Sequence, residues 1–511
     1  MLNLTVLPAV SYTHLTLIIL LSSCNAVKRV KDGQLLLTNN TVFVNDEKVN
    51  NDAINGLILQ KPNSKLRLHI YNIARENPDS LFNAKLQKHL DSMGFVDKVI
   101  SKKQLRQVAN YKTGFNNWLK RTGEAPVIIN NERADKSAER LKLYFDSKGY
   151  FNSETGFAVD SIPNKAKRGE VNYRVTTGQA YTIDSISRKI ASPDLDSIYK
   201  RHQGLSLVKE KQQFDLALFA AERERLNSLF LNNGIFGFQP SSITFDVLRD
   251  TLKENEDYKM PVTLRIDNNS RRVNNTVTEI PYKVHTVKNV NIYADYDFTS
   301  SKDSLQSVQH NNYTIYFKDK LRYKPKALTD AVAIIPGDIY REDKKTLTYR
   351  QISNLRTFKY PNIPLSYADS TDAQLEANIY LASRPKFSLT FNADVSHSNI
   401  QDVGLAFSTS LVSLNVFRGA ETLELAFRGN IGASRDFRAA DSRFFNISEF
   451  GADLRLKFPR IWFPVNTDHL IPKSMSPNTL VSLGTSFQTN IGLDKQTITS
   501  ILNYSWQPNL S

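Results

Sequence analysis

The one cysteine of the 511-residue chain, Cys24, is the residue whose chemistry the sequence constrains most closely. A single thiol has no disulfide partner within the chain, so it is either an inert side chain or a nucleophile that becomes modified. Cys24 follows an apolar run at residues 15–21 and two small residues, Ser22 and Ser23. About seven to fifteen apolar residues suit a signal peptide, whereas a membrane-spanning helix needs about twenty. The position of Cys24 therefore predicts modification at the end of a targeting segment.

The sequence Leu21-Ser22-Ser23-Cys24 resembles the lipobox of bacterial lipoproteins. In that motif the cysteine thiol receives a diacylglycerol and becomes the new N-terminus after cleavage. The resemblance makes residues 1–24 a lipoprotein signal peptide and Cys24 the lipid anchor. No acidic run follows Cys24, which favours a mature N-terminus in the periplasm. A generic signal peptide and an unmodified thiol are the alternatives.

No other group of residues suggests catalysis or a metal site. The eight histidines are dispersed without a His-x-x-x-His pair, and no nucleophile elbow, phosphate loop or dinucleotide fingerprint occurs. The formal net charge of +15 comes largely from scattered basic residues. Such scattering fits solvated faces or anionic lipid better than nucleic acid. We therefore expect no enzyme activity, no cofactor, no metal and no nucleic-acid partner.

Any functional surface must instead be positioned by repeated elements, which occur three times along the chain. The first copy has an amphipathic helix at residues 134–147, with Gly149 at its expected C-terminal cap. A turn at Gly149, Tyr150 and Phe151 follows, and then come two strands near residues 156–162 and 170–176. Helix, Gly-aromatic turn, strand, strand is thus one unit.

The second and third copies keep this order. The second has a strand at 181–190, a helix within 213–232, a turn with Gly234 and Phe236, and strands at 242–248 and 261–266. The third has a strand at 282–293, a helix near 342–355 and strands at 363–367 and 373–381. An insertion rich in Lys, Asp and Tyr separates its first strand from its helix. An unrelated small α+β repeat is one interpretation.

A second interpretation comes from resemblance. The β-α-α-β-β order, KGYF at residues 148–151 and FDLALFAAERERLNSLFLNNGIFGF at 214–238 resemble POTRA domains, the periplasmic modules of the BamA/TamA-type outer-membrane assembly family. QKPNSKLRLHIYN at 60–72 resembles the lipoprotein branch, often called TamL. The resemblance implies an N-terminal periplasmic region at 25–122 that could hold a divergent POTRA unit. It further implies a POTRA-like unit at 123–178, a POTRA domain at 179–268 and one with an insertion at 279–383.

From residue 385 onward, apolar residues recur at every second position, as they do in β-strands. Residues 386–396 alternate strictly between an apolar face and a polar one that carries Ser388, Thr390, Asn392 and Asp394. Similar segments follow at 402–413, 421–431, 448–458, 478–490 and 497–506. Charged residues at the polar positions suit a water-filled lumen. Residues 385–511 are therefore predicted to be about six strands of an antiparallel transmembrane β-barrel, with a soluble β-sandwich as the alternative.

Two further stretches extend the resemblance into this region. NVFRGAE at residues 415–421 and LRLKFPRIWFP at 454–464 resemble segments around the early barrel strands of the family. The family barrel has more strands than this region supplies. The resemblance therefore implies that the sequence is truncated at its C-terminus, with a curved, unclosed sheet. The predicted fold class is α+β tandem POTRA repeats followed by an incomplete barrel.

The resemblance also implies a function in outer-membrane protein assembly or translocation. Partners would be unfolded outer-membrane clients, outer-membrane lipid and an inner-membrane or periplasmic assembly protein. Strand edges of the repeats would capture clients by β-augmentation. The first barrel strand, with Lys386, Ser388, Thr390, Asn392 and Asp394, would open as a lateral gate. A passive outer-membrane pore or adhesin and a soluble-domain binding lipoprotein are the alternatives.

Overall fold

The computed structural model describes residues 26–76, 84, 87–88, 102–249, 257–273, 276–296, 305–368, 373–397, 403–433, 447–465, 467, 469–490 and 493–508. Cys24 and the lipobox residues Leu21, Ser22 and Ser23 lie outside these ranges, so the lipid anchor stays a prediction. The chain divides into two compact units, Met1–Ser187 with Leu207–Ala220 and Asp246–Thr263, and the remaining segments to Ser511. No helix in the described ranges is long and apolar enough to cross a bilayer.

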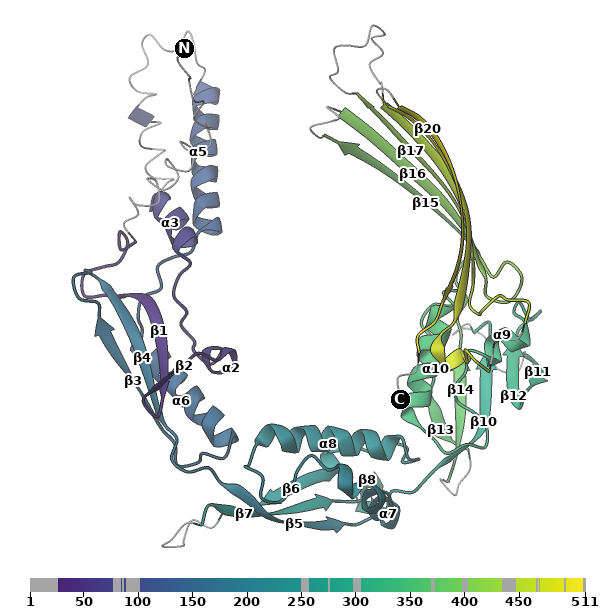
Figure 1. The fold of residues 1–511 in the computed structure, drawn as a ribbon, viewed down its shortest axis with the longest axis horizontal. Helices are drawn as coiled ribbons and strands as arrows, with labels where there is room; N and C mark the ends of the chain where they lie inside the picture. The colour runs from purple at the N-terminus through teal and green to yellow at the C-terminus, as the bar shows by residue number, and fades with distance from the viewer. Residues whose placement is uncertain are drawn as a thin grey trace, which may run out of the picture. The chain divides into compact units, whose positions relative to one another are not determined.

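The first repeat is a four-stranded sheet with α6 (Asn131–Ser147) packed on it (Figure 1). The strand order is β2-β1-β4-β3. The strands are β1 (Leu36–Val44), β2 (Glu47–Val49), β3 (Glu154–Ser161) and β4 (Arg168–Thr176). β1 lies before residue 123, where the predicted POTRA-like unit begins. It nevertheless belongs to this sheet, because it pairs in parallel with β4 and its residues Leu37 and Val42 complete the core under α6. The helices before α6 whose bounds the structure describes are α2 (Asp52–Asn55), α3 (Lys65–Ile73) and α5 (Lys102–Thr122).

The second repeat has a three-stranded sheet, ordered β5-β7-β6, and two helices. Its elements are β5 (Thr182–Ile190), α7 (Pro193–His202), α8 (Leu216–Leu231), β6 (Ile243–Val247) and β7 (Lys259–Ile266). Leu195, Ile198, Leu226 and Phe230 of the helices pack with Ile266 in one core. A hairpin that the sequence analysis did not predict follows, β8 (Asn269–Val273) with β9 (Thr276–Ile280).

The third repeat is a five-stranded sheet in the order β11-β12-β10-β14-β13. Its elements are β10 (Thr286–Tyr293), β11 (Gln306–His310), β12 (Tyr313–Phe317), α9 (Pro325–Thr329), α10 (Glu342–Asn354), β13 (Leu365–Tyr367) and β14 (Gln374–Tyr380). The insertion supplies β11, β12 and α9. β10 pairs in parallel with β14 and has a register shift between Val287 and Asn289, as β1 has between Leu37 and Asn39 against β4. This shared irregularity indicates that the first and third units are copies of one design.

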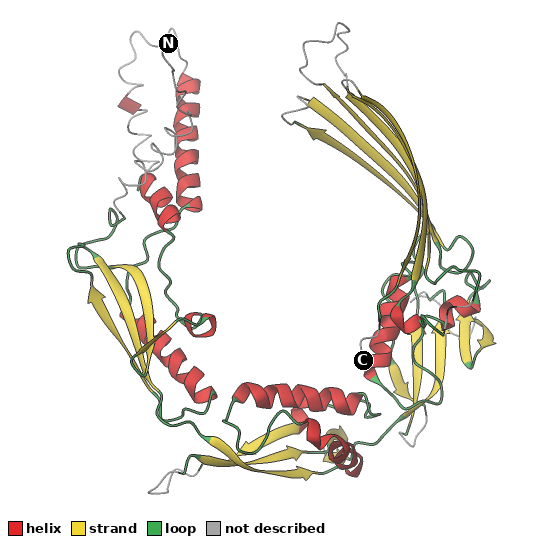
Figure 2. Cartoon of the chain, viewed as in Figure 1, coloured by secondary structure: helices red, strands yellow, loops and turns green. Residues whose placement is uncertain are grey.

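A curved six-stranded antiparallel sheet follows, in chain order from β15 to β20 (Figure 2). Its strands are β15 (Phe387–Ser396), β16 (Val403–Leu414), β17 (Thr422–Ala433), β18 (Ile447–Phe458), β19 (Asn478–Asn490) and β20 (Leu493–Ser505). The structure confirms the predicted fold class: α+β repeats followed by an open antiparallel sheet. β20 begins at Leu493, earlier than the predicted residue 497.

Candidate functional site

The six-stranded sheet has one apolar and one polar face. The register aligns a row of leucines across five neighbouring strands: Leu389, Leu411, Leu425, Leu454 and Leu483. These side chains are not buried in a core, and Leu389 is 74% exposed. A contiguous apolar surface of this kind needs either a covering layer or an apolar solvent.

The opposite face carries a group of charged side chains. Arg428 on β17 lies 2.5 Å from the Asp453 carboxylate on β18 and 3.9 Å from that of Glu449. Arg455 reaches the Glu424 carboxylate at 3.7 Å. Each acid is therefore matched by a guanidinium on a neighbouring strand. Charge-paired side chains on one face and leucines on the other fit strands that separate water from lipid.

The backbone of β15 has two sides, and hydrogen bonds decide which residues serve each. Leu414 of β16 donates its N–H to the Lys386 carbonyl at 2.8 Å, and this pair continues the register of Phe387 with Ser413. Residues of an antiparallel pair alternate between hydrogen-bonded and non-bonded positions. The residues whose backbone groups turn toward β16 are therefore Lys386, Ser388, Thr390, Asn392 and Asp394.

The intervening residues direct their backbone groups away from β16. We name this row the β15 outer edge, and it consists of the N–H and C=O groups of Phe387, Leu389, Phe391, Ala393 and Val395. No strand pairs with it in the described ranges of the chain. The polar residues singled out from the sequence thus lie on the predicted strand, but their backbone groups serve the internal pairing. Alternation alone could not reveal this, because both sets of residues alternate equally well.

The predicted turn residues join consecutive repeats. Gly149 lies just after α6 and Gly234 lies in the turn after α8, with positive φ values of 89° and 97°. The Tyr150 N–H returns to the Phe145 carbonyl at 3.0 Å, and the Ile235 N–H returns to that of Phe230 at 3.1 Å. Both turns therefore close their helices in the same glycine-dependent way.

The same turns also contact the next repeat. The Gly149 carbonyl accepts the N–H of Tyr181, and the Gly234 carbonyl accepts that of His285, each at 2.9 Å. The aromatic ring two residues after each glycine packs on that same residue: the ring centroids of Phe151 and Tyr181 are 5.4 Å apart, and those of Phe236 and His285 are 6.1 Å apart. Each Gly-x-aromatic turn therefore forms a hydrogen-bonded and packed junction between neighbouring repeats, which we call a joint.

The Gly234 joint makes a prediction for stability. A Cβ there would lie 2.7 Å from Val284 Cγ1 and 2.9 Å from Ile339 Cγ2, whereas a Cβ on Gly237, with φ of 72°, would meet nothing within 4 Å. Gly237→Ala should cost about 1–2 kcal/mol from the left-handed backbone alone. Gly234→Ala should cost about 1–3 kcal/mol more, because its methyl group clashes. Urea unfolding of both variants measures the difference, and equal losses would contradict a packed joint.

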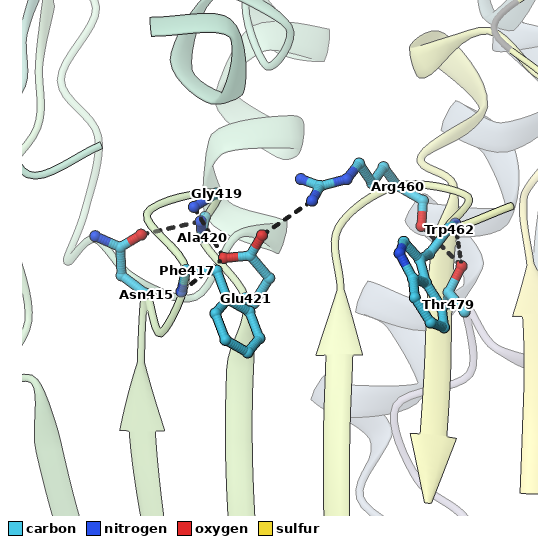
Figure 3. A network of polar contacts seen from close by, with 8 residues as sticks. All are labelled: Asn415, Phe417, Gly419, Ala420, Glu421, Arg460, Trp462 and Thr479. Carbon is cyan, nitrogen blue, oxygen red and sulfur yellow. Dashed lines mark hydrogen bonds and ion pairs between the residues drawn. The ribbon is translucent and has the colours of Figure 1, made fainter. Parts of the chain in front are cut away.

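A polar network ties the turns at one end of the sheet together (Figure 3). The Glu421 side chain is 0% exposed. Its carboxylate accepts the N–H groups of Phe417 at 3.2 Å and Gly419 at 2.8 Å, and it pairs with Arg460 Nη2 at 3.0 Å. Gly419 has to lack a side chain, because a Cβ would lie 2.3 Å from Glu421 Oε1. Glu421 therefore joins the β16–β17 turn to the segment after β18.

Further bonds connect this network to β19 and to the third repeat. The Thr479 hydroxyl donates to the Arg460 carbonyl at 2.9 Å and accepts the Trp462 N–H at 2.8 Å. Asn415 Nδ2 donates to the Arg322 carbonyl, and Arg418 Nη2 donates to the Leu321 carbonyl, both at 2.9 Å. The two stretches that resembled barrel segments thus meet in space and anchor the sheet to the third repeat. Their contact was not predicted from the sequence.

Among the described residues, no cluster of His, Cys, Asp or Glu could hold a metal ion. No protein-family model and no curated protein matches the chain. Solved structures that it resembles include POTRA3–5 of BamA from Haemophilus influenzae, at 11% identity and a TM-score of 0.29, covering 70% of this chain and 100% of that one.

Two further solved structures resemble the chain over a smaller share of their own length. BamA from Haemophilus ducreyi lacking POTRA domains 1–3 shares 12% identity at a TM-score of 0.31, covering 64% of this chain and 58% of that one. CdiB from Acinetobacter baumannii shares 10% identity at a TM-score of 0.25, covering 63% and 58%. The chain thus spans 58% of the length of each of these two proteins. The likeness is one of fold.

Proposed function

We propose that the chain is an outer-membrane assembly or translocation factor that inserts client strands by pairing them with the β15 outer edge. The observation that carries this proposal is the row of backbone groups from Phe387 to Val395 that no described strand satisfies. An unpaired edge is a template for an incoming strand. In this proposal the last strand of the complete barrel pairs weakly with β15, so that the edge opens as a lateral gate.

The sidedness of the sheet supports its placement in the outer membrane. The leucine row would face lipid, and the Arg428 and Arg455 ion pairs would face a water-filled lumen. The strands contain between 10 residues in β15 and 13 in β20, and about 9–11 tilted residues cross a bilayer. Trp462 and Trp506 lie beyond strand ends and are 55% and 45% exposed, as residues of an aromatic girdle would be.

The repeats are proposed to lie in the periplasm and to receive unfolded clients. Each repeat sheet has edge strands, such as β3 in the first repeat and β13 in the third. A client segment could pair with such an edge before transfer to β15. The driving force would be backbone pairing and the transfer of apolar strand faces into lipid, so that no covalent step is needed. The lipobox resemblance favours the lipoprotein branch, with Cys24 as an added anchor and an assembly partner on the repeats.

Lipid contact gives a direct test. In a Cys24→Ser background, Leu483→Cys and Ser482→Cys place single thiols on opposite faces of β19. With an environment-sensitive fluorophore attached and the protein in vesicles, doxyl-labelled lipid should quench the probe at 483 strongly and the matched probe at 482 weakly. The physical reason is that only the leucine face meets acyl chains. Equal or absent quenching at both positions would argue for a soluble sandwich.

A further inference from the structure

A cavity of about 350 Å³ lies where the third repeat meets one end of the six-stranded sheet. Helices α9 and α10, the segment 473–478 and the ends of β18 and β20 form its walls. Pockets for small ligands span about 300–1,000 Å³. The cavity is therefore large enough for a small molecule or for the head group of a larger one.

The charge of this cavity is strongly unbalanced. One lining residue is a carboxylate, Asp330, and four are basic: Arg356, Lys457, Arg460 and Lys473. Lys473 contacts Asp330, and Arg460 pairs with the buried Glu421. In the described part of the chain no carboxylate pairs with Arg356 or Lys457. Arg356 and Lys457 are therefore two unpaired cations in the lining of one cavity, and they give it a net positive charge.

The two unpaired cations of this cavity suit phosphate oxygens. A guanidinium offers paired N–H donors and an ammonium offers a compact charge, and both groups bind phosphate in proteins. Ser476 also lines the cavity, but its Oγ is buried, so the two cations would carry the binding.

We propose that this cavity binds a phosphate-bearing anion through Arg356 and Lys457, and that the anion is a soluble phosphate ester or the head group of an anionic phospholipid, which the experiment below distinguishes. Trp506 also lines the cavity, and it is a half-exposed aromatic at a strand end. The lipid source rests on the proposed membrane placement, whereas the phosphate site itself does not.

The test uses the full chain with two probes. Glycerol 3-phosphate is titrated into the protein in neutral detergent, and phosphatidylglycerol is offered in phosphatidylcholine nanodiscs and detected as bound lipid by native mass spectrometry. The Arg356→Gln, Lys457→Gln double variant should bind both probes at least about tenfold more weakly, since it loses two charge-assisted contacts. Asp330→Asn should bind more tightly, because a competing negative charge is removed.

The control is Lys318→Gln with Lys320→Gln, which makes the same charge change at exposed positions of the third repeat away from the cavity. This variant should bind both probes like the parent. Binding that is absent in the parent, or equal in all variants, overturns the phosphate site. Glycerol 3-phosphate binding that depends on Arg356 and Lys457, without phosphatidylglycerol binding, keeps the site and overturns its lipid source. Failure of the lipid-quenching experiment with soluble-probe binding intact would instead remove the membrane placement alone.

Discussion

Ala393→Pro is expected to abolish client insertion while the six-stranded sheet stays folded. The Ala393 N–H belongs to the β15 outer edge, so proline removes a donor that no described strand uses. Proline is tolerated on an edge strand when its missing N–H would face outward, but it cannot extend a ladder there. The measurement adds an unfolded barrel client to vesicles that carry the full-length protein and follows the protease-resistant client.

Asn392→Pro is the matched control on the neighbouring residue. The Asn392 backbone faces Ser408 of β16, so proline here breaks an internal ladder bond and should destabilise the sheet by at least about 1 kcal/mol. Asn392→Ser, which keeps the donor, should change neither stability nor insertion appreciably. Normal client insertion by the folded Ala393→Pro variant would refute strand pairing at this edge.

Arg460→Gln should destabilise the junction between the sheet and the third repeat by about 2–3 kcal/mol. The substitution leaves the Glu421 carboxylate buried without its cation, and a charge stripped of its partner is costly. Faster hydrogen exchange is expected at residues 321–324 and 415–421, because Asn415 and Arg418 hold the third repeat through the same turn.

A double-mutant cycle separates the ion pair from the surrounding packing. Glu421→Gln retains an acceptor for the Phe417 and Gly419 N–H groups but removes the charge. If the Glu421–Arg460 ion pair dominates, the loss in free energy of unfolding for the double variant with Arg460→Gln should be smaller than the sum of the losses for the two single variants. Additive losses would show that Arg460 acts through packing on Phe458, which its guanidinium overlies at 5.8 Å, and not through Glu421.

The sequence predicted the strands of the sheet closely, because a period of two and flanking turn residues locate a strand without knowledge of its neighbours. β15 and β18 lie within a residue of their predicted bounds. The pattern could not tell which backbone groups of β15 face outward, because that depends on the register with β16. Functional emphasis therefore fell on polar side chains such as Thr390, whereas the structure shifts it to the backbone of residues such as Ala393.

Elements whose formation depends on partners far along the chain were harder to predict from the sequence. β1 is explained only by its pairing with β4, far along the chain, and β12 by its pairing with β10. The resemblance of residues 415–421 and 454–464 to barrel segments marked both stretches, but not the Glu421–Arg460 contact between them. By contrast, Gly149 and Gly234 were recognised from local signals, since a helix end with a glycine has a local cause. Their role as joints required the tertiary contacts.

The three repeat sheets differ in how they protect the first strand. β2 covers the outer side of β1, and β12 with β11 covers that of β10. β5, the corresponding strand of the second repeat, has no described strand on that side, and only its start is paired there, because Ile183 exchanges backbone hydrogen bonds with Lys211 and Gln212. In the first and third repeats, a strand of the chain itself therefore occupies the position where a client strand could pair with the first strand of the repeat. Of these three strands, only β5 has no described strand beside its later residues, and the inserted hairpin of the third repeat fills the equivalent position beside β10.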